Sequence, residues 1–439
     1  MRFVDLFCGI GGFHAALSRL GHQCVFACDV DNFAAEVYER NWGQPGGFPV
    51  CNDIRKVIDR IPPMDMICAG FPCQPFSKSG AQAGFLDHTR GTLFSEICKL
   101  ADKHRPAFIL LENVPNIVSH DDGNTFRVIQ SSLEQIGYNF YHKILSPHNY
   151  GTCQIRKRIY IVCIRGDLVE DFEFKFPEET QSNLDVRTIL DENVDPKYSM
   201  TDDEIYWVNM WEDFLKNVNL ESKLPGHPIW AECFQRTEEI PGDLTKYTKE
   251  QLQEIAKQWG GYYWSKDVNH KMTKKEIIEA INLQPWKQNF VKNNRDLYAK
   301  NKEFIDKWLE EWKVLEFDEE NKPYIPKSRR KYEWQAGSES RTNWENLIQF
   351  RPSGIRIKRA DYFPTLVAIS QIPIVGWLKR KITPKECARI QDFDVDGKYG
   401  GHFVLGESDK QSYKQLGNAV SVKMVYLIQK SIDQLNLLD

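Results

Sequence analysis

Short apolar runs and helical patterns alternate along roughly the first 165 residues of the chain. The apolar runs, each of buried-strand length, are residues 2–7, 24–28, 64–69, 107–111 and 159–164. Apolar residues recur at helical spacing after the first two runs, as far as Leu20 and again over residues 33–41. Strands separated by helices at this spacing predict an α/β fold, a largely parallel sheet with helices on both faces.

The pattern changes after Gly166, where we expect a second, smaller domain. Residues 167–221 carry 16 Asp or Glu against 4 Lys or Arg, and residues 201–320 hold eight of the twelve Trp. Two capping boxes, at residues 248–251 and 273–276, predict helix starts in this region. One helical face joins the apolar side chains of Leu297, Phe304, Ile305, Trp308, Leu309 and Trp312. Aromatic stripes of this kind usually face inward, so this one is expected to form the core of the small domain.

Over residues 321–359 the charge reverses sign, with ten Lys or Arg against three Glu. Aromatic residues lie among these charges: Tyr324, Tyr332, Trp334, Trp344 and Phe350. Such a composition suits a surface that follows phosphates and stacks bases, but a solvated basic face explains it equally well. The candidate phosphate or guanine contacts are Arg351, Arg356, Lys358 and Arg359.

Composition and cysteine usage narrow the class of protein. The 439 residues are 41% hydrophobic and 27% charged with a formal net charge of −4, typical of a globular protein whose basic surface must be local. The 11 Cys are scattered, without a C-x-x-C pair or zinc-ligand spacing, which indicates a reduced, cytosolic protein and predicts no metal site. The strand-like start leaves no room for a signal peptide. The longest uncharged run, residues 362–378, is too short and too broken by Pro to span a bilayer.

A glycine-rich loop, from Asp5 to Gly12, follows the first apolar run. Its glycines let the backbone approach a ligand closely, and the next helix offers free N–H groups at its start. The Gly-Ile-Gly-Gly spacing does not match the G-x-G-x-x-G fingerprint of dinucleotide enzymes. Asp29 ends the second apolar run, where a carboxylate could accept hydrogen bonds from ribose hydroxyls, and Asp53 could bind an adenine amino group. The loop alone indicates a nucleoside cofactor, with a plain tight turn as the alternative.

Three further segments carry reactive or charged side chains. Cys73 lies in Gly-Phe-Pro-Cys-Gln-Pro-Phe-Ser, at the sheet edge where open α/β sheets bind ligands, although a lone loop thiol is more often inert. Glu112 follows the next apolar run, beside the end of the first strand, so a nucleophile and an acid would meet over one cleft. Alternation along Gln-Ile-Arg-Lys-Arg places Gln154, Arg156 and Arg158 on one face, where two guanidinium groups could converge on a polar ring or a phosphate.

Taken in order, these segments resemble those of the C5-cytosine DNA methyltransferase family. The matching segments are Phe7–Gly12, Gly70–Gln74, Glu112–Val114, Gln154–Arg158, Arg380–Gln391 and Gln415–Val422. Any one could occur by chance, but six in this order over nearly the whole chain are very specific. The resemblance implies a Rossmann-like methyltransferase sheet with helices on both faces, plus a smaller target-recognition domain in the stretch between the matching parts.

The resemblance also implies the reaction and its catalytic residues. The family transfers the methyl group of S-adenosylmethionine to carbon 5 of a cytosine in a short double-stranded DNA sequence. The Cys73 thiolate would add to carbon 6, Glu112 would hydrogen-bond the N3/N4 edge and supply a proton, and Arg158, on the face shared with Arg156, would orient the base. The cytosine must be flipped out of the duplex. Arg389 would brace the small domain against the large one.

Cofactor and DNA contacts follow from the same resemblance, with Asp29 standing where the family more often has Glu. The residues expected to bind S-adenosylmethionine are Asp5, Phe7, Gly9, Ile10, Gly11, Gly12, Asp29, Val30, Asp53, Ile54, Gly70, Pro72, Leu93, Asn418 and Val420. Residues 74–92 resemble a loop that closes on DNA, and its Gln74, Ser77 and Ser79 are expected to contact DNA.

Residues 1–185 and 401–439 are expected to form one catalytic and cofactor-binding domain, interrupted by a target-recognition domain over 186–400. Chain size favours a prokaryotic or phage enzyme, a monomer on DNA, that protects host DNA from a cognate restriction endonuclease. The acidic stretch 167–221 is expected to face away from the duplex. Three alternatives are a transfer-RNA cytosine methyltransferase, a catalytically silent DNA-binding relative and a nicotinamide-dependent oxidoreductase. The long basic, Trp-rich insert argues against the first, the intact catalytic residues against the second, and the unexplained Cys73 against the third.

Overall fold

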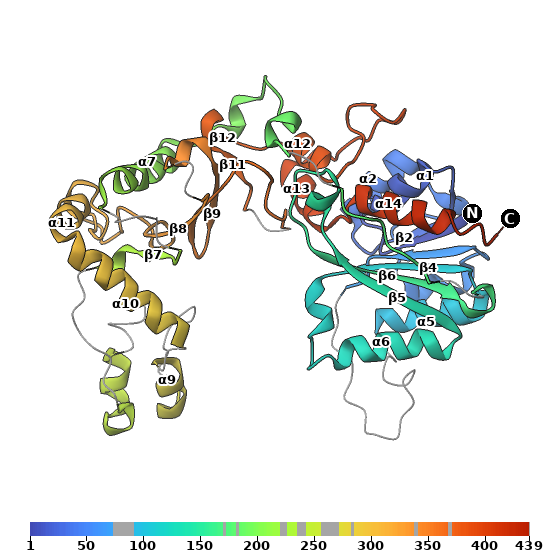
Figure 1. Ribbon diagram of the computed structural model, residues 1–439, viewed down its shortest axis with the longest axis horizontal. Coiled ribbons are helices and arrows are strands. Elements are labelled where there is room, and N and C mark those ends of the chain that lie inside the picture. The colour runs from blue at the N-terminus through green and yellow to red at the C-terminus, as the bar shows by residue number, and fades with distance from the viewer. Residues whose placement is uncertain are drawn as a thin grey trace. The chain divides into compact units, whose positions relative to one another are not determined.

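The computed structural model describes all residues except 73–91, 170–172, 181–183, 220–225, 235–242, 256–271, 282–284, 338–340, 368–370 and 439. The chain forms two compact units (Figure 1). Unit 1 comprises Met1–Val194, Asp361–Ser370 and Ile382–Asp439, and unit 2 comprises Asp195–Ala360 and Gln371–Lys381. The boundaries expected at residues 186 and 400 therefore differ from those of the structure, because residues 382–400 and a short segment around Phe363 pack within unit 1.

A six-stranded sheet organises unit 1, with strand order β2-β1-β3-β4-β6-β5. Its strands are β1 (Arg2–Leu6), β2 (Gln23–Cys28), β3 (Met66–Ala69), β4 (Phe108–Asn113), β5 (Tyr138–Leu145) and β6 (Arg158–Arg165). Neighbouring strands from β2 to β4 are parallel, whereas β6 is antiparallel to both β4 and β5. The largely parallel sheet confirms the prediction, but β3 lies between β1 and β4, so Glu112 lies beside the end of β3 and not of β1.

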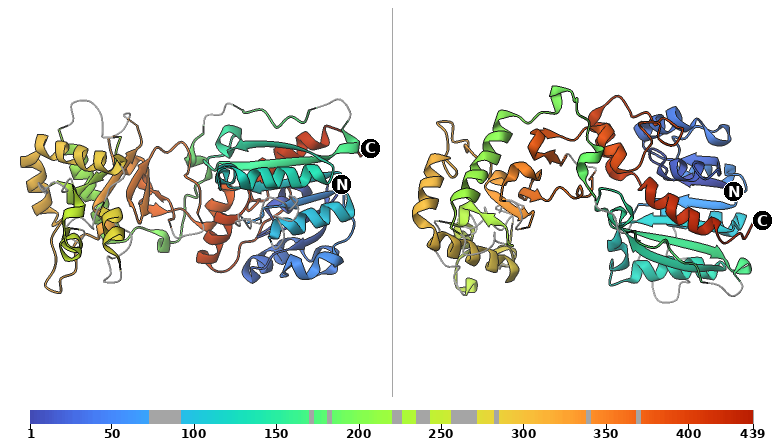
Figure 2. Two further views of the ribbon diagram at one scale, coloured as in Figure 1. Left: turned by 90° about the horizontal axis from the view of Figure 1, so that it is seen from below. Right: turned by 45° about the horizontal axis from the view of Figure 1, so that its top comes forward.

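Helices cover both faces of this sheet, with α1 and α14 on one face and α5 and α6 on the other (Figures 1 and 2). The helices of unit 1 are α1 (Gly12–Ser18), α2 (Asn32–Trp42), α3 (Ile54–Val57), α5 (Leu93–His104), α6 (Asn124–Gln135), α12 (Pro384–Ile390), α13 (Asp409–Asn418) and α14 (Val422–Asp433). Alternation along β1 sends Val4 and Leu6 into the main apolar core, while Asp5 points to the opposite face and accepts the N–H of His14 in α1.

Unit 2 contains a second six-stranded sheet, in the order β12-β11-β9-β10-β8-β7. Its strands are β7 (Ile229–Trp230), β8 (Lys331–Gln335), β9 (Leu347–Arg351), β10 (Gly354–Lys358), β11 (Ile374–Val375) and β12 (Arg380–Lys381). Its helices are α7 (Asp202–Asn217), α9 (Lys274–Ile281), α10 (Pro285–Lys300) and α11 (Lys302–Glu311). The structure confirms the inward-facing stripe, because Leu297, Ile305 and Trp308 are buried in the core of this unit.

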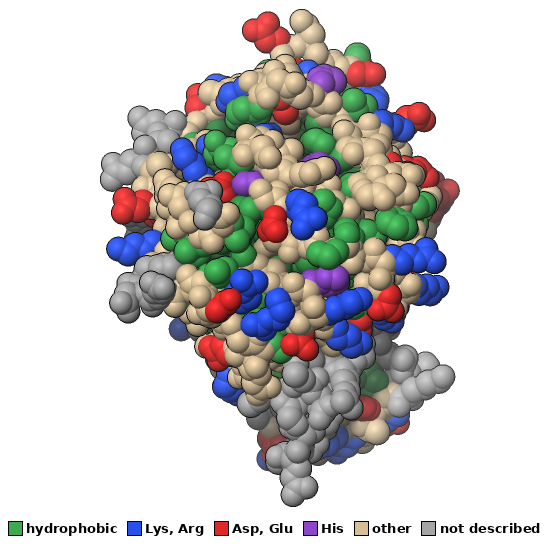
Figure 3. Space-filling view, turned by 90° about the vertical axis from the view of Figure 1, so that its right-hand side faces the viewer, with side chains coloured by type: hydrophobic (Ala, Val, Ile, Leu, Met, Phe, Trp, Pro, Cys, Tyr) green, Lys and Arg blue, Asp and Glu red, His purple; other side chains and the backbone are tan. Residues whose placement is uncertain are grey.

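The face of the molecule seen from the right of Figure 1 mixes acidic, basic and apolar side chains (Figure 3). Among the described residues that this view shows, acidic and basic side chains are interspersed and neither sign of charge dominates. Among the described residues, no helix combines the length and the apolar character needed to cross a bilayer.

Candidate active site

The glycine-rich loop joins the carboxyl end of β1 to the start of α1, and its backbone shape depends on three glycines. Gly9 has φ +54°, and a side chain there would enter open space. A Cβ at Gly11 would lie 2.4 Å from Nε1 of Trp42, and one at Gly12 would lie 2.5 Å from Cγ1 of Val420. The loop is therefore packed tightly on its inner side and open beside Gly9, which leaves room for a ligand against the backbone.

Two carboxylates stand behind this open side of the loop. Asp29 accepts the N–H groups of Gly9 and Asp31, both at 2.8 Å, and so ties the end of β2 to the loop. Asp5 is fully buried on β1, and its Oδ1 accepts no hydrogen bond from any described residue. Burial raises the pKa of Asp5 well above its usual value. An orphaned buried carboxyl oxygen beside an open glycine fits a polar ligand such as the aminoacyl end of a cofactor.

The other expected cofactor residues differ in how accessible they are. Val30 and Asn418 are exposed, and Phe7 is half-buried with φ +56°. Pro72 is exposed and Leu93 is partly buried against the main core. Ile54 is buried in that core, and Ile10 is buried as well.

Asp53 is already engaged by protein groups. It caps α3 by accepting the N–H of Arg55 at 3.0 Å and also pairs with the guanidinium of that arginine. The Arg55 side chain lowers the pKa of Asp53. An adenine amino group would therefore have to share this carboxylate with Arg55.

Glu112 lies near the carboxyl end of β4, next to the segment that leads to Cys73. A Cβ at Gly70 would lie 3.7 Å from Oε2 of Glu112, and the side-chain amide of Asn113 donates to the carbonyl of Phe71 at 2.8 Å. Cys73, Gln74, Ser77 and Ser79 lie outside the described residues. The contacts at Gly70 and Phe71 nevertheless fix the stretch that immediately precedes Cys73 against the Glu112–Asn113 pair.

Arg158, the first residue of β6, forms an ion pair with Glu112, with Nε 3.0 Å from Oε1. The N–H is not aligned for a hydrogen bond, and Oε1 accepts none from any described residue. Both side chains are nearly buried, 14% and 12% exposed. Burial raises the pKa of Glu112, while the nearby positive charges of Arg158 and Arg156 act against this shift. A buried carboxyl held this way can exist in its protonated form and donate a proton to a bound base.

Two further buried polar groups on this side of β6 lack partners among the described residues. They are both amide atoms of Gln154 and the hydroxyl of Tyr160, whose side chains are fully buried. Tyr160 is paired with Glu112 in the register of β4 and β6. The sequence analysis missed Tyr160, although the alternation that groups Arg156 with Arg158 places it on the same face. Unsatisfied buried groups beside an acid are what a site for a polar ring requires.

Arg156 points elsewhere, although it shares this face with Arg158. Its guanidinium donates to the carbonyl oxygens of Leu366, Gly417 and Ala419, at 3.3, 3.1 and 2.7 Å, and its side chain is 2% exposed. Its two terminal nitrogens are thus directed at main-chain carbonyls of unit 1, whereas Nε has no hydrogen-bond partner among the described residues. The structure does not bring the two guanidinium groups together on one ligand.

With this geometry established, the chain can be compared with known proteins. The model of the C-5 cytosine-specific DNA methylase family matches residues 1–434. The chain belongs to this family. The type II methyltransferase M.AluI of Cellulosimicrobium cellulans is 33% identical and covers 96% of this chain and 90% of its own length. M.BanI of Aneurinibacillus aneurinilyticus is 32% identical over 100% of this chain and 96% of its own length. M.HhaI of Haemophilus parahaemolyticus is 44% identical over 43% of this chain and 57% of its own length.

Of the small-domain DNA contacts expected of this C-5 cytosine-specific methylase, Arg351 lies on β9, Arg356 and Lys358 lie on β10, and Arg359 follows β10. The guanidinium of Arg356 pairs with Glu333 of β8 at 2.7 Å, and Arg351 lies 3.7 Å from the same carboxylate. Burial and the charge of Arg356 lower the pKa of Lys358, whereas Arg359 is exposed. Arg351, Arg356 and Lys358 share the face opposite the apolar core, because Ile355 and Ile357 of β10 point into that core.

Arg389 has a different role from the expected one. Its guanidinium pairs with Asp191 at 2.9 Å and Asp396 at 2.6 Å, and it donates to the carbonyl of Ile189. All three partners belong to unit 1. These contacts tie parts of unit 1 together.

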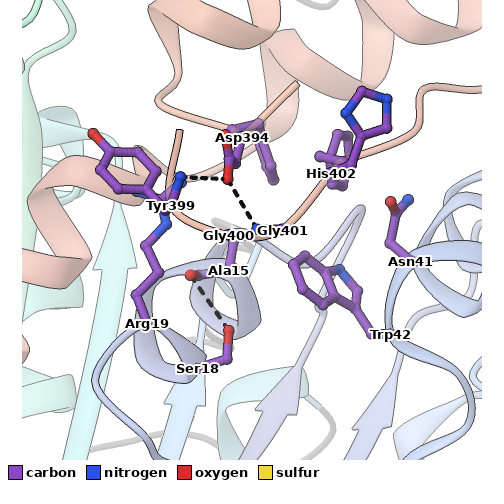
Figure 4. Close-up of a pocket in the computed structure, with 12 residues that line it drawn as sticks. Ala15, Ser18, Arg19, Asn41, Trp42, Asp394, Tyr399, Gly400, Gly401 and His402 are labelled. Atoms are coloured by element: carbon purple, nitrogen blue, oxygen red, sulfur yellow. Dashed lines mark hydrogen bonds between the residues drawn. The ribbon is translucent and has the colours of Figure 1, made fainter. Parts of the chain in front are cut away.

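A cavity of about 240 Å³ lies elsewhere on unit 1, between α1, the end of α2 and the segment 393–403 (Figure 4). Arg19, Asn41 and Asp394 line it, and their polar atoms bond to protein groups. None of the catalytic residues expected from the methylase motifs borders this cavity.

Proposed function

We propose that this methylase transfers the methyl group of S-adenosylmethionine to carbon 5 of a flipped-out cytosine within a short, specific double-stranded DNA sequence. The observation that carries the proposal is the cluster at the ends of β3, β4 and β6. There a buried Glu112 meets Arg158, unsatisfied polar groups and the stretch leading to Cys73.

Cytosine needs help from the protein because carbon 5 has too little electron density to attack an electrophile. The Cys73 thiolate adds to carbon 6 and pushes electrons toward carbon 5 and N3. Glu112 hydrogen-bonds the N3/N4 edge and places a proton at N3 as negative charge builds there. Once carbon 5 carries the methyl group, its proton leaves and the thiolate is eliminated, which restores the aromatic ring.

Arg158 serves this chemistry through its charge. It stabilises the ionised form of Glu112 against the effect of burial, so the carboxyl can both give up and regain a proton. Its Nε lies 3.0 Å from Oε1 of Glu112, and its guanidinium also donates to the carbonyl of Lys157 at 2.8 Å. Tyr160 and Gln154 are additional candidates to contact the ring.

The residues around the glycine-rich loop fit a nucleoside cofactor. S-adenosylmethionine, when bound, supplies a methyl group activated by its sulfonium. The open side of Gly9 and the orphaned oxygen of Asp5 would hold its aminoacyl end, and Asp29 would accept hydrogen bonds from the ribose. Val420 and Asn418 would close the pocket from the C-terminal side.

Unit 2 is proposed to be the target-recognition domain, with Arg351, Arg356, Lys358 and Arg359 facing the DNA and the acidic stretch 167–221 facing away. M.AluI and M.BanI are type II methyltransferases, and their similarity supports a role of this chain beside a cognate restriction endonuclease in the cytosol of a prokaryote. A monomer on DNA is sufficient for this reaction, because all proposed site residues come from one chain.

Bisulfite sequencing of plasmid DNA from cells that express the chain tests this proposal. Protected cytosines in one short repeated context are expected. If the protein is folded and binds S-adenosylmethionine but no cytosine is protected, DNA is not its substrate, and methyl incorporation into total transfer RNA becomes the next measurement.

Cys73→Ser tests the nucleophile directly. Methylation is expected to fall at least about a hundredfold with cofactor binding unchanged, because the thiol is needed for addition and not for holding the cofactor. Cys51→Ser, which removes an exposed thiol without a proposed role, is the matched control. Residual activity of Cys73→Ser within tenfold of wild type contradicts the assignment.

A further inference from the structure

The buried guanidinium of Arg156 joins three parts of the chain that are far apart in sequence. The Arg156 side chain is 2% exposed and donates to the carbonyl oxygens of Leu366, Gly417 and Ala419. The main-chain N–H of Arg156 donates to Oγ of Ser146 at 3.1 Å. A buried charge is costly unless polar groups surround it, so these carbonyl oxygens account for its presence. Burial and the charge of Arg158 lower the pKa of Arg156 to about 10, which keeps it protonated at neutral pH.

Two of the three carbonyls that Arg156 binds, those of Gly417 and Ala419, belong to the segment 417–421 that links α13 to α14. Gly417 lies in the last turn of α13, where carbonyl groups lack partners within the helix and carry partial negative charge. A guanidinium satisfies two of these carbonyls at once, because its nitrogens diverge in one plane. A lysine ammonium, a single nitrogen on a flexible stem, cannot reproduce that spread.

The same turn forms one wall of the proposed cofactor site. Val420 packs directly on the start of α1, so closely that a Cβ at Gly12 would lie 2.5 Å from its Cγ1 and 3.0 Å from its carbonyl oxygen. The neighbouring Ala419 carbonyl is the shortest of the Arg156 contacts. A displacement of this carbonyl would therefore move Val420 relative to the glycine-rich loop.

We infer that Arg156 is a positioning residue that holds the turn 417–421 against Gly12 and thereby sets the affinity for the methyl donor. Two residues further along, Arg158 acts on the acid Glu112 instead. This inference rests on the proposed function, because it assigns the turn to the S-adenosylmethionine site. Arg156 and Arg158, which the sequence pattern places on the same face, thus have different roles.

Arg156→Lys and Arg158→Lys form a matched pair of variants for the test. Calorimetric titration with S-adenosylmethionine, without DNA, measures the affinity, and initial rates at saturating cofactor measure kcat. Arg156→Lys is expected to weaken cofactor binding about tenfold with kcat within about threefold of wild type. Arg158→Lys is expected to lower kcat with cofactor affinity within twofold. Gln391 donates to the carbonyl of Leu416 from another side, which helps the turn to persist in the Arg156 variant.

Ser146→Ala provides a milder change, because it removes the acceptor for the Arg156 N–H and leaves the charge in place. A weakening of cofactor binding of about threefold with unchanged kcat is expected. Cofactor affinity within twofold of wild type in both Ser146→Ala and Arg156→Lys would overturn the inference, as would a loss confined to kcat in Arg156→Lys. Failure of the wild-type protein to bind S-adenosylmethionine would instead refute the proposed function.

Discussion

Replacing Gly12 with Ala tests whether the contact between α1 and Val420 controls the cofactor site. A Cβ at this position would lie 2.5 Å from Cγ1 of Val420 and 3.0 Å from its carbonyl oxygen. Gly12 is the first residue of α1, and no positive φ is present there to make Ala strained. The substitution therefore adds one methyl group to a tight contact and changes little else.

The expected magnitude follows from two opposing effects. Inserting a methyl group into a well-packed contact costs about 1–3 kcal/mol, whereas Ala gains up to about 1 kcal/mol over Gly in a helix. The difference, up to about 2 kcal/mol once the full helix gain is subtracted, acts where Val420 meets the loop, because Arg156 holds the adjoining Ala419 carbonyl in place. A cost of 1.4 kcal/mol corresponds to about a tenfold weaker affinity for S-adenosylmethionine.

Calorimetric titration of Gly12→Ala with S-adenosylmethionine measures this effect. Gly401→Ala is the matched control, since its new Cβ would lie 3.8 Å from its nearest neighbour, Oδ2 of Asp394, beside the cavity of Figure 4. The Gly12→Ala/Val420→Ala double variant removes the closest contact. Its loss of binding free energy for S-adenosylmethionine should therefore be smaller than the sum of the losses in the two single variants. Cofactor affinity of Gly12→Ala within twofold of wild type would refute the reasoning, as would strictly additive effects in the double variant.

Two predictions concern the stability of unit 1. Burial lowers the pKa of His14 to about 4, so the unfolded chain binds the proton more readily than the folded chain does. The contribution of the neutral imidazole to the free energy of unfolding is therefore fully present above about pH 6.5 and is lost as the pH falls toward 4. Urea unfolding of wild type is expected to lose about 2 kcal/mol more between pH 7 and pH 5 than His14→Gln does, and equal losses in the two proteins would contradict this. Glu386→Ala removes a buried carboxylate that accepts the N–H groups of Asp191 and Thr383, at 2.8 and 2.7 Å, and is expected to cost about 2–4 kcal/mol. Glu276 belongs to an exposed capping box with Thr273, and Glu276→Ala should lower the free energy of unfolding by less than about 1 kcal/mol in the same assay. Similar losses for Glu386→Ala and Glu276→Ala would contradict the expected effect of burial.

The sequence predicts those elements whose residues are buried in a regular pattern. The core strands of unit 1 are continuous apolar runs, and the stripe from Leu297 to Trp308 points inward because its spacing matches a helix. Strand β5 was missed because it lies at the sheet edge, where most of its side chains are exposed or half-buried and no apolar run marks it.

Side-chain partners from distant parts of the chain are the other information that the sequence pattern lacks. Alternation places Arg156 on the correct face of its segment, but its acceptors are main-chain carbonyls more than two hundred residues away, which no local pattern encodes. Arg389 likewise has a distant partner in Asp191, although its other partner, Asp396, is only seven residues away. Residue types and periodicity therefore locate a site, whereas tertiary packing decides which of its members can meet a ligand.

The direction of β6 explains why residues 154–158, which precede a strand, belong to the same site as Gly70 and Glu112, which lie at the ends of strands. Gly70 and Glu112 lie at the ends of parallel strands, so both reach the carboxyl edge of the sheet. Strand β6 is antiparallel to β4, and its register pairs Tyr160 with Glu112 and Ile159 with Asn113. The residues that enter β6 therefore arrive at this same edge. Successive residues of β6 alternate between faces, so Arg158 and Tyr160 both lie on the side of Glu112. Arg156 precedes the strand, and its side chain contacts the turn 417–421 instead. The reversed direction of β6 thus brings Glu112 and the turn 417–421 into contact with residues of one short segment, Arg156–Tyr160.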